Sequence, residues 1–195
     1  MRLTFRSLTG AGVDGVLDDV AALRIAVFRD WPYLYDGDRA YERRYLDVYR
    51  LTRDAIVVSA HDGERLVGAA TGLPLRDADG EFRAAFERIG ADIAGVFYCA
   101  ESVLLPEYRG QGAGHRFFDL REAHARAQGY GQVVFCGVVR PDDHPARPSA
   151  YRPLDAFWRK RGYAPLPGVT TEYSWKDIGA RSETRKPLQF WSRML

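Results

Sequence analysis

The sequence predicts an α/β fold with a mixed β-sheet flanked by helices. Apolar, β-branched segments alternate with segments of helical periodicity along the 195 residues. A glycine turn near the middle of the chain joins a strand-like segment directly to a helix-like one. Neither a repeat nor a low-complexity linker divides the sequence, so we expect a single domain over residues 1–195.

The first part of the chain predicts a strand, two helices and a pair of strands. The strands are expected over 2–7, 55–60 and 66–73, and the helices over 16–28 and 39–51. Asp14 is the expected N-cap of the first helix, because its side chain can accept a hydrogen bond from a backbone N–H. Asp62-Gly63, between the paired strands, is typical of a hairpin turn.

The remainder of the chain predicts four strands and three helices. The strands are expected over 96–105, 132–139, 170–175 and 187–194, and the helices over 115–127 and 154–161, with a further short helix inside an insertion at 76–95. An irregular, proline-rich loop covers 140–153. Gly162 is expected to end the last helix.

The turn from Pro106 to His115 is the strongest local signal, because it lies between a predicted strand and a predicted helix. Glycines let backbone N–H groups converge, and a helix N-terminus carries partial positive charge. Arg109 adds a full positive charge. The turn therefore predicts a phosphate-binding site, and a glycine turn that binds no ligand is the alternative.

Two other phosphate motifs match this turn less well. A dinucleotide fingerprint requires Gly-x-Gly-x-x-Gly and an acidic residue at the end of the next strand. Here the third glycine comes one position early, and the next strand ends in Arg140. The Lys-Ser/Thr ending of a P-loop is also missing from the turn.

Composition and charge exclude several classes of protein. The net charge is +2 and acidic residues alternate with basic ones, so we expect no nucleic-acid partner. No apolar run reaches the ~18 residues of a membrane span. The first residues lack the apolar region of a secretory signal, so we expect a cytoplasmic protein that does not bind a membrane.

The cysteines and histidines predict neither a disulfide nor a metal site. Cys99 and Cys136 fall inside predicted central strands, where small buried thiols are common. The four histidines are scattered without the spacing of metal ligands. We therefore expect no metal cofactor.

The segment around the glycine turn resembles the coenzyme-A loop of the GNAT superfamily of acyltransferases. It has an apolar strand, then Pro-x-Tyr-Arg at 106–109, then glycines at 110, 112 and 114. The later segment Phe157-Trp158 to Gly162-Tyr163 is similar to the family pattern Phe-Tyr-x-x-x-Gly-Phe. The order of predicted elements is similar to the GNAT core over nearly the whole length, which implies a mostly antiparallel central sheet flanked by helices.

The resemblance implies acetyl-CoA as the acyl donor. In this family the loop amides hold the pyrophosphate, and the end of the preceding strand pairs with the pantetheine arm through its backbone. The residues expected to contact the cofactor are Val103, Leu104, Leu105, Arg109, Gly110, Gln111, Gly112, Ala113, Gly114, His115 and Trp158.

Glu101 is the candidate general base for an attacking amine. It lies just before the positions expected to contact pantetheine, so it could remove the amine proton directly or through water. The alternative is a glutamate at a strand bulge, bonded to the backbone or to an arginine. The resemblance further implies that the backbone N–H of Leu104 stabilises the oxyanion.

The sequence departs from the family at the group that protonates the leaving thiolate. The family often has a tyrosine there, whereas this chain has Trp158, whose indole N–H cannot deliver a proton at neutral pH. Tyr151 and His144, in the preceding loop, are the candidate substitutes. Otherwise the thiolate leaves without an acid, and Trp158 packs against the cofactor arm.

The connection between the first two helices is expected to line the acceptor pocket, since it forms one wall of that pocket in the family. Aromatic rings beside carboxylates attract a cationic amine. The candidate residues are Trp31, Tyr33, Tyr35 and Asp36. The alternative is an aromatic anchor that packs the loop on the core, followed by a turn at 36–38. The insertion at 76–95 and the loop at 140–153 depart from the family and are expected to shape the pocket.

The expected function is acetyl-CoA-dependent transfer of an acetyl group to a primary amine, with a small molecule favoured over a protein as acceptor. Direct attack in a ternary complex is expected, because no nucleophile is placed for a covalent intermediate. A non-enzymatic acyl-CoA-binding sensor and an NAD-type binder are the alternatives. The closing segment Phe190-Trp191 is compatible with a homodimer edge or with the end of the sheet.

Overall fold

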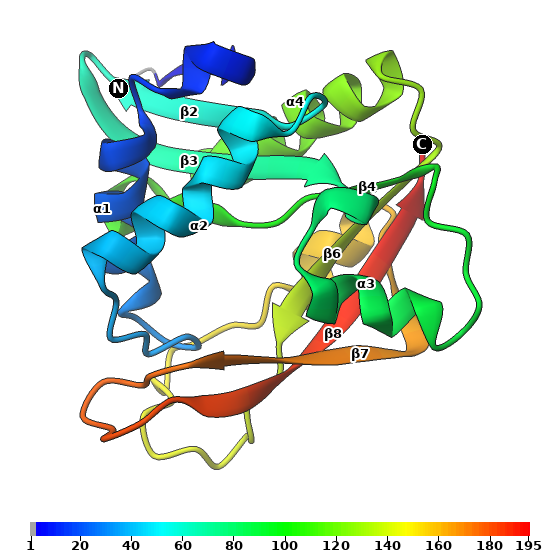
Figure 1. The fold of residues 1–195 in the computed structure, drawn as a ribbon. Helices are drawn as coiled ribbons and strands as arrows, with labels where there is room; N and C mark the ends of the chain where they lie inside the picture. Colours follow the sequence, from blue (N-terminus) through cyan, green and yellow to red (C-terminus); the bar gives the residue numbers. More distant parts are fainter. Residues whose placement is uncertain (1–2) are drawn as a thin grey trace.

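The structure, a computed structural model, describes residues 3–195 as an eight-stranded sheet with helices on both faces (Figure 1). The strands are β1 (Thr4–Leu8), β2 (Ile56–Asp62), β3 (Arg65–Pro74), β4 (Val96–Tyr98), β5 (Ser102–Leu104), β6 (Gln132–Val138), β7 (Ala164–Trp175) and β8 (Thr184–Met194). The helices are α1 (Leu17–Phe28), α2 (Arg39–Leu51), α3 (Gly80–Glu87), α4 (Ala113–Ala127) and α5 (Asp155–Lys160).

The strands lie in the order β1-β2-β3-β4-β6-β8-β7, and β5 pairs with β3. β4 and β6 are parallel, and the other pairs among the described residues are antiparallel. The predicted α/β fold with a mostly antiparallel sheet is therefore confirmed. Arg2, which begins the predicted first strand, lies outside the described residues.

The two N-terminal helices show where local signals succeed and fail. α2 has the predicted bounds, and the Asp38 carboxylate caps it by accepting from the Tyr41 N–H at 2.7 Å. The predicted cap of α1 is wrong, because Val16 occupies the N-cap position. Asp14 instead closes a short 3₁₀ turn by donating its N–H to the Ala11 carbonyl at 3.2 Å.

The predicted continuous strand over 96–105 is also wrong, because a β-bulge divides it into β4 and β5. Ala100 donates its N–H to the Thr71 carbonyl, while the Thr71 N–H donates to the Glu101 carbonyl. Two residues of one strand thus oppose a single residue of β3, which defines a bulge. Buried Arg121 of α4 stabilises it by donating to both of these carbonyls at 3.0 Å.

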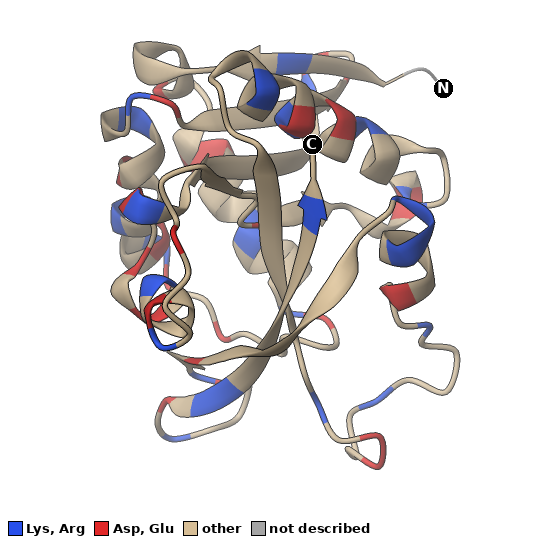
Figure 2. Cartoon of the chain, turned by 90° about the vertical axis from the view of Figure 1, so that its right-hand side faces the viewer, with Lys and Arg blue, Asp and Glu red and all other residues tan. Residues whose placement is uncertain are grey.

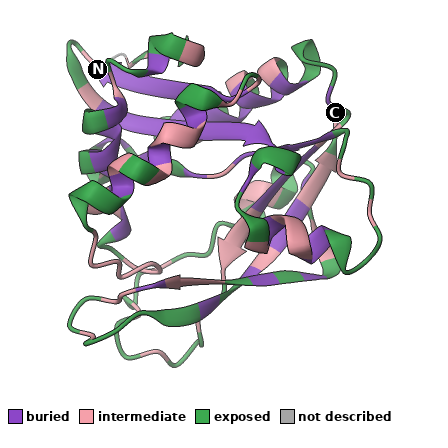
Figure 3. Cartoon of the chain, viewed as in Figure 1, coloured by how far each residue is buried: buried purple, intermediate pink, exposed green. Residues whose placement is uncertain are grey.

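Two apolar clusters bury the two faces of the sheet (Figure 3). One lies beneath α1, α2 and α3 and includes Leu17, Leu46 and Phe86. The other lies beneath α4 and α5 and includes Phe117 and Phe135. With both faces covered, the sheet is open to ligands mainly where its strands separate.

β5 and the second half of β6 separate in the middle of the sheet. Cys99, just after β4, donates its backbone N–H to the Val134 carbonyl of β6 at 2.8 Å and so extends the β4–β6 pairing by one hydrogen bond. Beyond it, residues 102–104 pair with β3, whereas residues 135–138 pair with β8. We call the gap between 102–104 and 135–138 the strand divergence.

Candidate functional site

Leu104 is paired with Gly68 of β3, but its backbone N–H has no acceptor on a neighbouring strand within residues 3–195. Glu101 and Leu105 are hydrogen-bonded to Thr71 and Val67 of β3. Because hydrogen-bonding direction alternates in an antiparallel pair, Val103 also faces β3, while Leu104 faces the divergence. Of the three predicted pantetheine positions, Leu104 is therefore the one whose N–H is directed into the divergence.

The glycine turn presents a row of free backbone donors. Gly110 and Gly112 have φ of +75° and +85°, a left-handed conformation that glycine adopts at little cost. None of the N–H groups from Gly110 to His115 donates to another group in residues 3–195, and the first to do so is that of Arg116. These donors, at the start of α4, suit an anion such as a pyrophosphate.

Tyr108 anchors the turn to the rest of the protein. Its ring is buried, and its hydroxyl donates to Asp62 at the end of β2 at 3.0 Å. The Arg109 Nε donates to the Leu104 carbonyl at 3.2 Å, and Gln111 donates to the Glu107 carbonyl at 3.2 Å. The Arg-x-x-Gly-x-Gly segment is thus held in one conformation by its own side chains.

The remaining predicted cofactor residues lie where α4 and α5 meet. The His115 ring packs on Phe157 with centroids 4.9 Å apart, and a Cβ on Gly114 would lie 3.5 Å from the Phe157 ring. Trp158 packs against Phe135 and covers Gly137 of β6, where a Cβ would come within 2.9 Å of the indole. Trp158 therefore lies on the β6 side of the strand divergence.

A pocket opens on the opposite face of the sheet, between α1, α2, α3 and β7. It reaches the divergence at Ala100-Glu101 and at Cys136. Its lining residues are Arg24, Phe28, Tyr33, Tyr35, Tyr41, Glu42, Tyr45, Phe82, Tyr98, Ala100, Glu101, Cys136, Tyr173, Ser174, Trp175 and Leu188. The hydroxyls of Tyr41 and Tyr173 lie 3.1 Å apart and link α2 to β7.

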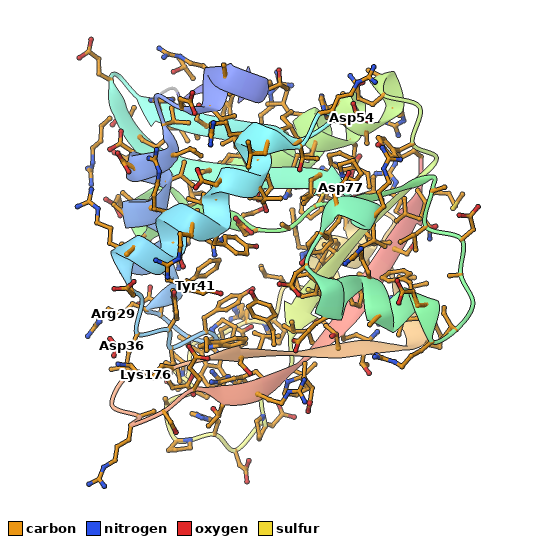
Figure 4. The ribbon with its side chains drawn as sticks, in the orientation of Figure 1. Arg29, Asp36, Tyr41, Asp54, Asp77 and Lys176 are labelled. Carbon is orange, nitrogen blue, oxygen red and sulfur yellow. The ribbon has the colours of Figure 1, made fainter. Side chains whose placement is uncertain are left out.

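The structure brings two of the four predicted acceptor residues into this pocket, Tyr33 and Tyr35. Trp31 instead packs on the 140–153 loop, with its ring centroid 5.0 Å from that of His144 and 5.9 Å from that of Tyr151. Asp36 lies at the surface beside Lys176, at 2.7 Å (Figure 4). Trp31, Asp36 and Tyr151 are thus absent from the pocket lining.

Arg24, Glu42 and Glu101 form a buried charged triad at one end of the pocket. They come from α1, α2 and the bulge, and their exposed fractions are 7%, 0% and 9%. Arg24 pairs with Glu42 through Nε and with Glu101 through Nη1. The Tyr45 hydroxyl donates to Glu101 at 3.3 Å. Glu101 therefore has the arginine partner that the alternative interpretation required, and it also lines the pocket.

The charges of the triad change the pKa values around it. Burial opposes the charge on Arg24, but Glu101, Tyr45 and Glu42 together outweigh it and raise the Arg24 pKa well above its ordinary value. Burial, with Glu101 second, raises the pKa of Tyr45. The guanidinium is therefore charged and the Tyr45 phenol neutral at every physiological pH.

Both cysteines are protonated thiols at neutral pH. Burial raises the pKa of Cys136 to about 12 and that of Cys99 to about 11. Cys136 lines the pocket and lies 3.2 Å from the Tyr98 hydroxyl. A thiol rather than a thiolate stands beside the strand divergence, and a thiol is a poor nucleophile.

Sequence reasoning missed Arg24 and Glu42, although a signal for each was present. Glu42 falls three residues before Tyr45 on the apolar stripe of α2, and Arg24 follows Val20 by four on that of α1. A charged residue on the buried stripe of a helix needs a partner. Each of the two stripes carried one such residue, of opposite sign.

The rest of the surface offers fewer functional features. Acidic and basic residues are interleaved over the face shown in Figure 2. No helix within residues 3–195 combines the length and the apolar character needed to cross a bilayer. In the same residues, no three His, Cys, Asp or Glu side chains are grouped to hold a metal ion.

Comparison with known proteins identifies a family for most of this chain. Residues 21–163 match the model of the acetyltransferase (GNAT) family. No curated protein matches the sequence.

Solved structures with similar folds have low sequence identity. The ribosomal-protein-alanine N-acetyltransferase of Brucella melitensis has a TM-score of 0.64 at 15% identity, over 98% of this chain and 99% of that one. NAA60 of Arabidopsis thaliana, in complex with acetyl-CoA, has a TM-score of 0.64 at 10% identity, over 100% and 99%. The protein yncA of Salmonella typhimurium, with its cofactor acetyl-CoA, has a TM-score of 0.60 at 13% identity, over 99% and 94%. At these identities the likeness concerns the fold.

Proposed function

The chain belongs to the acetyltransferase (GNAT) family, and from that premise we propose that it transfers an acetyl group from acetyl-CoA to the primary amine of a small molecule. The row of free N–H groups from Gly110 to His115, beside the strand divergence, is the observation that carries this proposal. It matches the pyrophosphate of coenzyme A in charge and in donor geometry. The solved neighbours that contain acetyl-CoA support the same donor.

The proposed donor arrangement places the thioester between the two faces of the sheet. With the pyrophosphate on the glycine turn, the pantetheine arm follows β5 and pairs with the backbone of Leu104. The thioester then reaches the bulge, where Ala100, Glu101 and Cys136 border the acceptor pocket. The Leu104 N–H is the proposed donor to the oxyanion.

Direct transfer needs one proton acceptor and no covalent enzyme intermediate. The amine binds in the pocket as an ammonium and loses a proton to Glu101, directly or through a water. The amine nitrogen attacks the thioester carbon, the C–S bond breaks, and the nitrogen loses its second proton as the leaving thiolate takes one up, so that one proton per turnover is released to solvent from Glu101. The high pKa of Cys136 argues against acetylation of that thiol.

Tyr151 is the proposed proton donor to the thiolate, because it is a tyrosine like the residue that often has this role in the family. Burial, with Asp155 second, raises its pKa, so its hydroxyl is protonated at neutral pH. The ring packs on Trp31 outside the pocket lining, so this role requires the 140–153 loop to move toward the thioester. A Tyr151→Phe variant with unchanged kcat would show that the thiolate leaves without this acid.

A small acceptor is favoured because the pocket is closed along one side. The loop after α1 is joined to the β7–β8 hairpin by an isolated bridge between Tyr35 and Asp177. The Asp36 N–H donates to the Lys176 carbonyl at 2.9 Å, and the Ile178 N–H donates to the Leu34 carbonyl at 2.7 Å. These bonds leave no open groove there for an extended polypeptide.

The second candidate function, an acyl-CoA-binding sensor, rests on Trp158 in place of the family's tyrosine. Calorimetric titration with acetyl-CoA, CoA and NAD, followed by an assay of free CoA release with a panel of amines, separates the candidates. The proposed enzyme binds both CoA forms, ignores NAD, and releases CoA only with an amine. Binding of acetyl-CoA without release for any amine would identify a sensor, and binding of NAD alone would contradict the donor site.

A further inference from the structure

The acceptor pocket carries an excess of buried negative charge. Among its lining residues Arg24 is the one Lys or Arg, whereas Glu42 and Glu101 are both acidic. The triad of these three residues therefore has a net charge of −1 when both carboxylates are ionised. The Oε1 atom of Glu42 is buried and accepts no hydrogen bond from residues 3–195, whereas Oε1 of Glu101 is the atom that pairs with Arg24. Such an uncompensated charge favours a cation as the missing partner.

Arg24, the one basic residue of the pocket lining, is already paired and cannot bind a substrate carboxylate. Arg24 directs Nε to Glu42 and Nη1 to Glu101. The faces of the guanidinium are occupied too, because its carbon lies 4.5 Å from the centroid of the Tyr45 ring and 5.0 Å from that of Phe28. A substrate carboxylate could reach Arg24 only by displacing one of the glutamates, which would leave that glutamate buried without a partner.

The two basic side chains behind the Trp175 wall of the pocket, Lys186 and Arg140, are not free to bind a carboxylate. Lys186 and Arg140 lie beyond the Trp175 ring, at 4.8 Å and 5.7 Å from its centroid. Both pair with Asp177, and Arg140 also donates to the Pro32 and Tyr33 carbonyls. Their positive charges therefore stabilise the wall of the pocket and do not bind a carboxylate of the acceptor.

A second cavity extends the acidic character of the first. The two share Tyr45, Phe82 and Tyr98 in their linings. The second adds Asp77 and Asp79 to its lining and no Lys or Arg, although Asp77 also pairs with Arg76, outside the lining, at 3.6 Å. Asp79 uses one carboxylate oxygen to cap α3 through the Glu81 N–H, at 2.9 Å. A substrate that extends from the first cavity into the second thus meets further carboxylates.

We infer that the acceptor is a cationic amine that carries no carboxylate, and that Glu42 is the residue that determines this specificity. The inference rests on the proposed function, since it describes the acceptor of that reaction. The ammonium compensates the residual charge of the triad, and the aromatic rings of the lining contact the apolar body of the amine. A carboxylate on the same molecule would face Glu42 and Glu101 and be repelled.

Matched pairs of an amino acid and the amine formed by its decarboxylation test the inference. Tyrosine with tyramine, phenylalanine with phenethylamine, histidine with histamine, and lysine with cadaverine differ within each pair only by the carboxylate. We expect kcat/KM to favour the amine by on the order of 100-fold, because the carboxylate of the amino acid is brought against the like charges of Glu42 and Glu101. The methyl ester of each amino acid, which keeps the bulk but loses the charge, should recover much of the difference.

The Glu42→Gln variant tests whether Glu42 causes the preference for amines over the corresponding amino acids. It removes one negative charge and keeps the side-chain shape, so the ratio of kcat/KM within each pair should fall about tenfold. A purely structural role for Glu42 would instead lower both members of a pair alike. Glu172→Gln, on the exposed face of β7, is the matched control and should leave the ratio unchanged.

Two outcomes would overturn the inference and leave the proposed function standing. One is turnover of amino acids and their decarboxylated partners with equal kcat/KM. The other is turnover of amino acids or peptides with none of the four amines. Failure of acetyl-CoA to bind, or the absence of any amine-dependent CoA release, would instead count against the proposed function. If Glu42→Gln does not fold, the esters on the wild-type protein still decide between charge and bulk.

Discussion

Glu101 is the ion-pair partner of Arg24, and in the proposed mechanism it also accepts a proton from the amine. Arg24 holds one side of its carboxylate, and Tyr45 donates to the other oxygen. These contacts hold the carboxylate against α1 and α2, in the lining of the pocket. An acceptor ammonium would add a second positive charge beside it, so the proton to be removed lies next to its acceptor.

Substitution of Glu101 by Gln tests the proposed base. We expect kcat to fall about 100-fold or more, because general-base catalysis contributes that order of acceleration. The acidic limb of the pH–rate profile should disappear, while the Kd for acetyl-CoA measured by calorimetry stays the same. An unchanged profile would remove Glu101 as the base, and Glu172→Gln again serves as the control.

Substitution of Gly112 tests the proposed binding of phosphate by the glycine turn. A Gly112→Val variant should weaken binding of CoA at least tenfold, because a β-branched residue at φ +85° strains the turn by roughly 1–2 kcal/mol and moves its N–H groups. Gly129→Val is the matched control, since Gly129 has φ +87° and no atom within 4 Å of a Cβ, but lies past the end of α4. Equal CoA affinity in both variants would contradict the assignment of the turn.

At the scale of elements, local signals predicted most of the fold and long-range contacts decided the rest. The bounds of α2 and the glycine turn before α4 follow from capping, periodicity and turn residues that are adjacent in sequence. The bulge at Ala100-Glu101 depends on Arg121, which lies 20 residues away on α4. No pattern within the strand reveals that partner, so the strand was predicted as continuous.

For the candidate site too, the sequence predicted the part built from neighbouring residues better than the part built from distant ones. The cofactor turn was visible because its glycines and Arg109 lie within six residues of each other. The acceptor pocket is assembled from α1, α2, α3, β6, β7 and β8, so the sequence could suggest aromatic candidates but not which of them meet. Tyr33 lines the pocket, whereas Trp31, two residues earlier, packs on a loop that has no regular structure.

Substitution of Arg121 by Met tests whether Arg121 stabilises the bulge. The change should lower the free energy of unfolding by about 2 kcal/mol, since it removes a buried donor from the Thr71 and Glu101 carbonyls. The kcat should fall as well, because Glu101 and Leu104 flank the relaxed bulge. Arg126→Met, at an exposed position of α4, is the control. Denaturant unfolding that gives equal stability for the two variants would show that Arg121 does not hold the bulge.

At the scale of the whole molecule, the two proposed binding regions lie on opposite faces of the sheet. The glycine turn and α5 lie on the side of the second apolar cluster, and the acidic pocket lies on the side of the first. The strand divergence connects the two sides at Leu104 and Cys136. In the proposed mechanism, donor and acceptor therefore enter from different directions and meet at the bulge.

The stability of the whole protein should fall at high pH because its thiols are buried. Cys99 and Cys136 have pKa values of about 11 and about 12 in the folded state, above the ordinary value of 9.0. The unfolded thiols therefore lose protons first as pH rises, and the unfolded state is favoured. Between pH 9 and 11 the free energy of unfolding should fall by a few kcal/mol, and the Cys99→Ala/Cys136→Ala double variant should lose less across that range. Equal slopes for both proteins in calorimetry would contradict the assignment.

Direct transfer from acetyl-CoA to an amine is tested most directly by mass spectrometry of an acid-quenched reaction. The wild-type protein is mixed with isotopically labelled acetyl-CoA and tyramine and sampled during turnover. We expect one N-acetylated amine for each free CoA and no label on the protein at any time. Label on Cys136 during turnover, or bound acetyl-CoA that never yields an amide, would contradict the account.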